Sequence, residues 1–310
     1  MSNKIATRDA YGKALVKLGQ INDDVVVLDA DLSKSTKTND FFKAYPNRFF
    51  NMGIAEQNLV GAACGFAAAG KIPFASTFAM FATGRAFEVI RNSVCYPKLN
   101  VKICATHAGI TVGEDGGSHQ SVEDISLMRS IPNMTVLVPA DGIEAEKMIL
   151  EAAKFNGPMY VRLGRSAVPT LFDENYEFKI GKGAVLRDGN DATIIACGIM
   201  VNEALVAADI LKAENIDVRV INMSTIKPID TELIISAAKE TKAIVTAEEH
   251  SVIGGLGSAV SEVVSENHPV IVKKVGMNDT FGESGTPNEL LEKYGLTAKN
   301  ISDKVREALK

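Results

Sequence analysis

The sequence lacks the features that would direct a protein into a membrane, out of the cell or onto nucleic acid. Residues 1–8 contain no apolar core of the kind found in signal peptides. The longest apolar stretch, residues 59–70, is too short and too rich in small residues to span a bilayer. The 33 basic residues form no cluster and are outnumbered by 38 acidic residues, which gives a net charge of −5. We therefore expect a cytoplasmic protein whose main partner is neither nucleic acid nor an anionic membrane.

Common motifs for disulfides, metals and nucleotides are also missing. No two cysteines have the CxxC spacing, and we expect all four to be reduced packing residues: Cys64, Cys95, Cys104 and Cys197. There is no GxxxxGK(S/T) phosphate loop and no HExxH metal motif. The glycines at 254–257 do not form a dinucleotide fingerprint, because Val260 stands where the third glycine is needed. We expect the nearby Glu248, Glu249 and His250 to lie in a loop or an interface.

The chain has the length and composition of a two-domain globular protein. It has 310 residues, of which 46% are hydrophobic, and a typical domain has about 150 residues. Short β-branched runs alternate with helical patterns, which predicts parallel sheets covered by helices on both faces. The expected strands of the first half are 25–31, 73–78, 101–107, 134–139 and 159–163, and the expected helices are 56–69, 84–95, 122–129 and 142–155.

A segment with little periodicity divides this pattern in two. Residues 171–190 carry acidic residues and several glycines, and we expect them to be a linker between domain 1–170 and domain 191–310. The second domain repeats the alternation, with expected strands at 192–197, 218–222, 243–247 and 269–275. The predicted fold class is α/β, with two doubly wound domains and mainly parallel sheets. In such sheets, ligands bind beyond the carboxyl ends of the strands.

Glu56 stands where an expected strand turns into a helix rich in alanine and glycine. One interpretation is a first-turn glutamate that the helix dipole favours. The other is a carboxyl group among small apolar residues, whose desolvation would raise its pKa and let it hold or share a proton. The residues alone leave both interpretations open.

Residues 105–120 form the segment richest in reactive side chains. Two of the four histidines, His107 and His119, lie here with Glu114, Asp115 and several glycines. The segment could be a polar surface turn or a polar active site. Phe78 and Phe81, which follow another expected strand, would share one face of a helix; they either pack in the core or form a platform for a flat ring.

Four segments resemble the transketolase family: GIAEQN at 53–58, STFAMF at 76–81, THAGITVGEDGGSHQ at 106–120 and FGESGTP at 281–287. Their order and spacing resemble the pyrimidine-binding and C-terminal domains of that family. The resemblance spans essentially the whole chain, but the N-terminal half of the family is missing. In that half, a Gly-Asp-Gly…Asn motif holds the diphosphate of thiamine diphosphate and its divalent metal.

The resemblance therefore implies the C-terminal subunit of a split transketolase. Such a subunit requires an N-terminal transketolase subunit as partner, which would hold Mg²⁺ or Ca²⁺ with the cofactor diphosphate. Transketolase active sites lie between subunits, so we expect two copies of each chain in an α2β2 assembly, and little activity from this chain alone. The family transfers a two-carbon ketol unit from a ketose phosphate to an aldose phosphate.

The resemblance also assigns roles to residues. Glu56 matches the glutamate that bonds the pyrimidine of thiamine diphosphate and promotes deprotonation of its reactive carbon. Phe78 and Phe81 match the aromatic residues that pack on the pyrimidine, and Asp31 matches an aspartate beside the cofactor. Asp115 and His119 match sugar-binding positions, and His119 would also assist proton transfer.

The substrate phosphate would be held by residues that match phosphate-binding positions of the family: Arg8, Ser35, His107 and Arg165. Cationic and hydroxyl donors suit a phosphate ester. Arg162 lies three positions before Arg165, so the sequence leaves open which of the two arginines contacts the phosphate.

Other functions remain as alternatives. The 1-deoxy-xylulose-5-phosphate synthases are similar around residues 53–57 but usually carry an acidic residue where His107 stands. The beta subunits of 2-oxo acid dehydrogenases are similar in size but lack the loop with two histidines. A third alternative is a non-catalytic regulatory subunit on the same fold.

Overall fold

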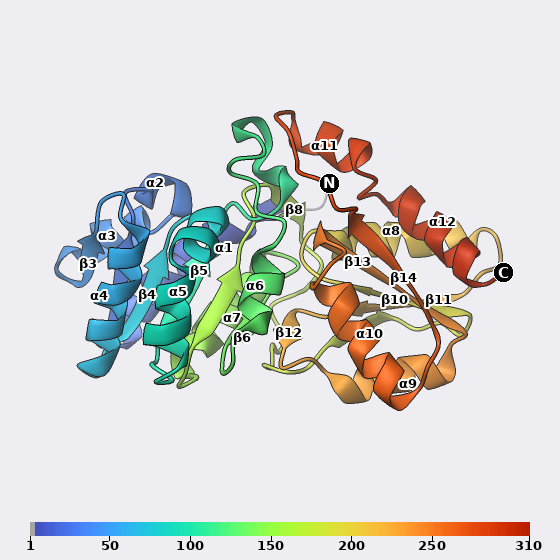
Figure 1. Cartoon of the computed structure of the whole chain (residues 1–310), viewed down its shortest axis with the longest axis horizontal. Coiled ribbons are helices and arrows are strands. Elements are labelled where there is room, and N and C mark those ends of the chain that lie inside the picture. Colours follow the sequence, from blue (N-terminus) through green and yellow to red (C-terminus); the bar gives the residue numbers. More distant parts are fainter. Residues whose placement is uncertain (1–3) are drawn as a thin grey trace.

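The structure is a computed structural model that describes residues 4–310, and it consists of two α/β lobes side by side (Figure 1). The N-terminal lobe contains a seven-stranded sheet in the order β12-β6-β7-β5-β4-β2-β3. Its strands are β2 (Val25–Asp29), β3 (Phe49–Asn51), β4 (Ile72–Ser76), β5 (Lys102–Ala105), β6 (Thr135–Leu137), β7 (Met159–Arg162) and β12 (Thr225–Lys227). All pairs are parallel except β12 with β6.

Helices cover both faces of this sheet, as the hydrophobic strands predict. In β2, Val25 and Val27 belong to one core cluster, while Val26 and Leu28 belong to another. Successive side chains of a strand point to opposite faces, so both faces must be covered. One face carries α1 (Thr7–Ile21), α3 (Asn39–Ala44) and α7 (Gly142–Lys154), and the other carries α4 (Glu56–Ala68), α6 (Asp124–Ser130) and the segment 81–95.

Segment 81–95 differs from the expected helix 84–95. Two π-helical turns, η2 (Phe81–Arg85) and η3 (Ile90–Cys95), flank the short helix α5 (Phe87–Val89). The other short elements of this lobe are α2 (Ser33–Thr36), the 3-10 turns η1 (Pro46–Arg48) and η4 (Ile110–Asp115), and a small antiparallel pair of β1 (Lys4–Ala6) with β8 (Ala167–Pro169).

The C-terminal lobe has a five-stranded sheet in the order β14-β13-β10-β11-β9. Its strands are β9 (Ala184–Arg187), β10 (Ala192–Ala196), β11 (Val218–Asn222), β13 (Ala243–Ser251) and β14 (Ile271–Met277). Only β9 is antiparallel to its neighbour. Helices α8 (Met200–Lys212) and α12 (Ala298–Ala308) cover one face, α9 (Thr231–Glu240) and α10 (Leu256–Asn267) cover the other, and α11 (Pro287–Lys293) lies near the first lobe. The expected α/β class with mainly parallel sheets is confirmed.

The two lobes share more structure than the sequence suggests. Strand β12 comes from the second half of the chain but completes the first sheet. Residues 171–190, expected to be a linker, include β9, which pairs with β11. One core cluster contains side chains of both lobes, such as Tyr160 and Leu256. The lobes therefore share a continuous apolar interior.

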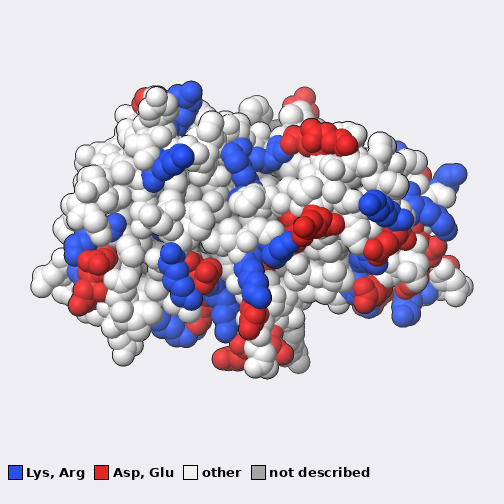
Figure 2. Space-filling model, turned by 90° about the horizontal axis from the view of Figure 1, so that it is seen from below, with Lys and Arg blue, Asp and Glu red and all other residues white. Residues whose placement is uncertain are grey.

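The four cysteines are free and buried, as expected. No helix within residues 4–310 combines the length and apolarity needed to cross a bilayer. Figure 2 shows acidic and basic side chains interspersed on one face of the molecule, with uncharged areas between them.

Candidate active site

The carboxyl ends of β2, β4, β5 and β7 open onto one edge of the first sheet, because these strands are parallel neighbours. The chain segments that follow these strands bring most of the predicted site residues together at this edge. Phe78 and Thr106 form a backbone bridge just beyond β4 and β5, which fixes the start of both loops.

Glu56 is the first residue of α4, and its side chain is only 6% exposed. Its Oε1 accepts a hydrogen bond of 2.9 Å from Nη1 of Arg85. The two side chains border a cavity of about 520 Å³ that Ala55, Gln57 and Asn58 also line. Glu56 is therefore a buried acid at the edge of a cavity, and the cation of Arg85 pairs with it.

A row of aromatic rings leads from this cavity into the sheet edge. The rings of Phe78 and Phe81 are stacked at 15°, with centroids 5.8 Å apart. Phe78 also stacks on His107, with centroids 3.8 Å apart. His119 meets both phenylalanines edge-on, at 6.4 and 5.3 Å. The two histidines of the glycine-rich loop therefore lie beside the aromatic pair, of which Phe81 is only partly buried.

His107 is held in one tautomer. Its Nε2 lies 3.0 Å from Nη1 of Arg8, which can only donate, so Nε2 is the acceptor. The proton is then on Nδ1, which lies 2.8 Å from Oγ1 of Thr106. Burial lowers the pKa of His107 to about 3, and the charges of Arg8 and Arg165 contribute further. His107 is therefore a neutral donor–acceptor bridge inside a basic cluster.

Arg8 and Arg165 supply the positive charge of this cluster. Arg8 also donates to the backbone oxygen of Ser35 at 3.1 Å, while its buried Nε has no partner among residues 4–310. Burial and the nearby Arg165 lower the pKa of Arg8, although Asp9 opposes the change. Arg165 reaches the carboxylate of Glu114 at 3.3 Å. An unsatisfied N–H group among cations that disfavour one another is suited to an anionic ligand.

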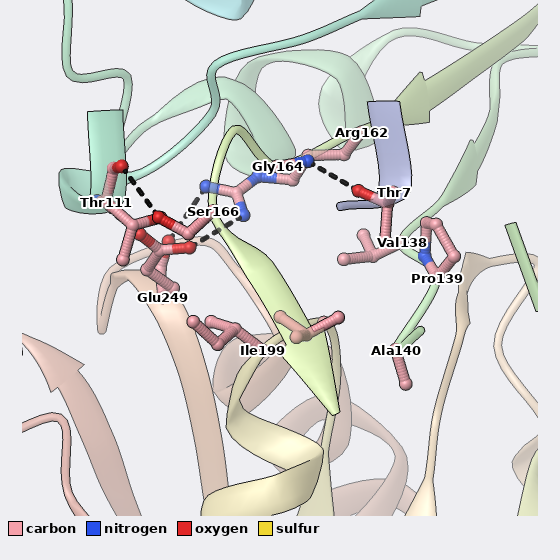
Figure 3. Close-up of a pocket in the computed structure, with 12 residues that line it drawn as sticks. Thr7, Thr111, Val138, Pro139, Ala140, Arg162, Gly164, Ser166, Ile199 and Glu249 are labelled. Atoms are coloured by element: carbon pink, nitrogen blue, oxygen red, sulfur yellow. Dashed lines mark hydrogen bonds and ion pairs between the residues drawn. The ribbon is translucent and has the colours of Figure 1, made fainter. Parts of the chain in front are cut away.

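Arg162 does not belong to this cluster. It is buried between the lobes (Figure 3), where its Nε donates to Asp124 at 2.8 Å and its Nη2 donates to the backbone oxygen of Glu249 at 2.8 Å. Burial alone would lower the pKa of Arg162, but Asp124 and Glu249 raise it above its ordinary value. A small cavity of about 20 Å³ lies beside it, with room for about one water. The geometry thus favours Arg165 for contact with a substrate anion.

The remaining predicted residues lie at the rim. Asp31 is exposed, adopts a left-handed φ of 64°, and exchanges hydrogen bonds with Asn51 at 2.9 and 3.1 Å. Asp115 ends η4 and is exposed, and His119 is partly buried beside Ser118 at 3.0 Å.

Three further residues position the site, and sequence reasoning missed two of them, Gln120 and Arg85. Asp29 is buried and accepts from Leu32 N and from two threonine hydroxyls at 2.6–2.9 Å, which fixes the loop that carries Ser35. Gln120 donates to two carbonyl groups of its own loop and to Glu283 of the second lobe. Arg85 pairs with Glu56. The expected parallel-strand topology indicates Asp29, because it stands at the carboxyl end of β2, and nothing in the sequence pattern indicates the other two.

Glu248, Glu249 and His250 lie in β13; the last two form part of the interface between the lobes, one of the two expected locations, while Glu248 accepts from backbone N–H groups of α10 in its own lobe. Glu249 accepts from Thr111 N at 2.7 Å, and His250 Nε2 accepts from Ser126 N at 3.2 Å. Within residues 4–310, no group of three or more His, Cys, Asp or Glu side chains is arranged to hold a metal ion.

The fold and the site together define a two-lobed α/β protein with a buried acid, a pair of stacked aromatic rings and a basic cluster at one sheet edge. Two family profiles match the chain: "Transketolase, pyrimidine binding domain" over residues 3–170 and "Transketolase, C-terminal domain" over residues 181–301. The chain belongs to the transketolase family.

Similar proteins include both half-length and full-length transketolases. A transketolase C-terminal section of Methanocaldococcus jannaschii is 52% identical over 308 residues, which are 98% of this chain and 96% of that protein. A solved structure described as "Split gene transketolase, inactive beta4 tetramer" is 60% identical, with a TM-score of 0.91 and 99% of each chain covered. Human transketolase is 40% identical over 310 residues, but these are only 49% of the human protein.

Proposed function

We propose that this chain is the C-terminal subunit of a split, thiamine diphosphate-dependent transketolase that transfers a two-carbon ketol unit from a ketose phosphate to an aldose phosphate. One observation carries the proposal: a buried acid, Glu56, faces a cavity on the same sheet edge as the basic cluster of Arg8, His107 and Arg165. One end of this edge suits a neutral heteroaromatic ring and the other suits a phosphate ester.

The residues around the cavity fit the pyrimidine ring of thiamine diphosphate. Phe81 offers a flat aromatic face that already carries a planar guanidinium at 4.3 Å, and Glu56 can accept or hold a proton at a ring nitrogen. When bound, thiamine diphosphate supplies a nucleophilic carbon that attacks the ketose carbonyl. In this proposal Glu56 holds the proton that makes this possible, Phe78 and Phe81 orient the ring, and Asp31 lies beside the cofactor.

The basic cluster would hold the phosphate of the sugar. Arg8, with its unpaired Nε, and Arg165 would donate to phosphate oxygens, with His107 between them and Ser35 alongside. His119 and Asp115 lie on the same loop as His107, and His119 meets the ring of Phe81 edge-on. A sugar hydroxyl and the reacting oxygen would lie beside them, between phosphate and cofactor. His119 would move a proton at that oxygen.

The cofactor diphosphate and its Mg²⁺ or Ca²⁺ would be held by an N-terminal subunit. Ile54, two residues before Glu56, is 79% exposed, which is consistent with a partner surface beside the cavity. The coverage of only half of human transketolase and the close similarity to a split-gene protein support a two-chain enzyme. We propose an α2β2 assembly in the cytoplasm, with this chain inactive by itself.

The test is to reconstitute the chain with its N-terminal subunit and assay xylulose 5-phosphate with ribose 5-phosphate. Glu56→Ala should assemble normally but lose at least about 100-fold in turnover, because proton transfer by a positioned group contributes about that much or more. Glu151→Ala, which removes a glutamate from α7, should be as active as wild type.

Other outcomes would overturn the proposal. Consumption of pyruvate in place of ribose 5-phosphate would indicate a synthase of the 1-deoxy-xylulose-5-phosphate type. An assembled pair without any turnover would favour a regulatory subunit, and Glu56→Ala activity within a few-fold of wild type would remove Glu56 from its role. Full activity of the single chain with thiamine diphosphate and magnesium would remove the need for a partner.

A further inference from the structure

Arg85 occupies the space between the buried acid and the aromatic platform. Its Nη1 donates to Glu56 at 2.9 Å, and its Cζ lies 4.3 Å from the centroid of Phe81. The guanidinium is planar, carries N–H donors and lies on an aromatic ring. A single side chain, itself at the cavity, therefore contacts both the carboxylate that lines the cavity and the ring of Phe81.

The local backbone explains this placement. Phe81 and Arg85 are the first and last residues of the π-helical turn η2. The wider turn of a π-helix brings residues four apart almost directly above one another, so Arg85 falls over the ring of Phe81. The backbone oxygen of Arg85 accepts from Nε2 of Gln57 at 3.2 Å, which ties η2 to the first turn of α4. The backbone at Arg85 is thus tied to α4, while more than half of the side chain is exposed to solvent.

We propose that the Arg85 side chain occupies the position where the cofactor ring binds. The ring must displace this side chain, so Arg85 lowers the affinity for the cofactor. The proposal rests on the proposed function. A pyrimidine ring that stacks on Phe81 and bonds to Glu56 would use the same aromatic face and the same carboxylate as the guanidinium does. The pyrimidine ring and the guanidinium therefore cannot bind Phe81 and Glu56 at the same time.

The exposure of the two partners supports a displaceable guanidinium. The side chain of Arg85 is 56% exposed, whereas that of Glu56 is 6% exposed. Arg85 can therefore swing into solvent at low cost, because its charge is already largely hydrated. Glu56 is buried and cannot move into solvent in the same way. If Arg85 moved away and no ligand were bound, Glu56 would be a buried carboxylate with no cation beside it. Arg85 stabilises the empty site, and this stabilisation is given up when the ring binds.

Affinity for thiamine diphosphate is the decisive measurement. The reconstituted pair would be titrated with thiamine diphosphate and Mg²⁺ by calorimetry. Arg85→Ala should lower the Kd about three- to tenfold, which is the range expected when a partly exposed ion pair no longer competes. Arg85→Lys, which keeps the charge but loses the flat stacking surface, should lie between Arg85→Ala and wild type. Arg91→Ala, which removes an exposed arginine from η3, should bind like wild type.

Thermal unfolding of the isolated chain gives a second test. Arg85→Ala should lower the Tm by about 2–4 °C, and adding Glu56→Gln to that variant should restore most of the loss, because the unpaired carboxylate is then neutral. A Kd for Arg85→Ala that is unchanged or higher than wild type would overturn the inference, since Arg85 would then be a neutral bystander or a ligand of the bound cofactor. An assembled wild-type pair that binds no thiamine diphosphate would instead overturn the proposed function.

Discussion

His107 shows how one residue can be confined to a single protonation state by its surroundings. It is 3% exposed, adopts a left-handed φ of 58°, and sits between Thr106 and Arg8. Adding a proton to Nε2 would both bury a charge and break the bond from Arg8. In the empty site the folded protein therefore disfavours protonation of His107, and a bound anion would reverse part of that effect.

This confinement predicts a pH dependence of stability. The pKa of His107 is lowered to about 3 by burial and then by neighbouring charges, whereas in the unfolded chain it is near its ordinary value of about 6.5. Below pH 6.5 the unfolded state binds the extra proton, so the folded protein loses stability as the pH falls from 6.5 toward 3. The loss from this group approaches about 1.4 kcal/mol per pH unit.

Urea unfolding between pH 7 and 4.5 would measure the effect. His107→Gln should have a shallower decline than wild type, whereas His268→Gln, at the end of α10, should decline as wild type does. Parallel curves for wild type and His107→Gln would contradict the confinement of His107.

At the scale of elements, two arginines near the end of β7 lie in different surroundings. Arg162 is the last residue of the strand and points between the lobes, while Arg165 lies in the loop beyond it and belongs to the basic cluster with Arg8 and His107. The end of the strand decides this difference: Arg162 lies within β7, which is paired with β5 on one edge and with β6 on the other, whereas Arg165 lies beyond the paired residues.

The two arginines should respond differently to the same substitution. Arg162→Met leaves the buried carboxylates of Asp124 and Glu249 without their cation and should cost about 3–5 kcal/mol of stability. Arg165→Met should cost less than about 1 kcal/mol but raise KM for the sugar phosphates about tenfold or more, with a smaller effect on kcat. Denaturant unfolding and steady-state kinetics of the reconstituted pair measure both. Equal stability of the two variants would contradict the buried role of Arg162.

Elements with strong local patterns were predictable, and those that depend on distant contacts were not. Residues 25–28 are all apolar, and they form a strand buried on both faces. Helix α1 was not among the expected elements, because its buried side includes two glycines, Gly12 and Gly19. These glycines leave room for the close approach of Lys37 and Tyr45, a contact that the sequence does not show. The π-helical turns of 81–95 were expected to be an ordinary helix, since the apolar spacing does not distinguish the two.

The site was predictable to the extent that it follows from topology. Once parallel strands are expected, the loops after them must meet, and this brings His107, Phe78 and Arg165 to one edge. The role of each residue came from the family resemblance and stays a prediction. The pairing of Arg85 with Glu56 and the bonds of Gln120 across the lobes depend on side-chain positions that no sequence period encodes.

At the scale of the whole molecule, the two lobes form one folding unit. Strand β12 completes the first sheet, Lys227 donates to the carbonyl groups of Arg129 and Ile131 at 2.9 and 2.6 Å, and Arg162 bonds to Glu249. The loop that carries both histidines is also held from the second lobe, through Glu283. The geometry of the candidate active site therefore depends on residues that lie far from it in the sequence.

A fragment of residues 1–170 should accordingly fail to fold as a stable monomer. It would expose the edge of β6 and the apolar surface shared with the second lobe, and it would leave Arg162 with only part of its partners. Size-exclusion chromatography and thermal unfolding followed by circular dichroism would show aggregation or no cooperative transition. A monomeric fragment with a Tm near that of the full chain would contradict the single folding unit.

The position of β12 in the sequence also affects synthesis on the ribosome. When residues 1–170 have emerged, the first sheet still has an open edge at β6, and it stays open until residues 225–227 follow. At about 5–20 residues per second, this leaves an unpaired strand available to other nascent chains for several seconds. Slow translation through this interval would favour wrong pairing, so chaperone demand should be greatest before the second lobe is finished.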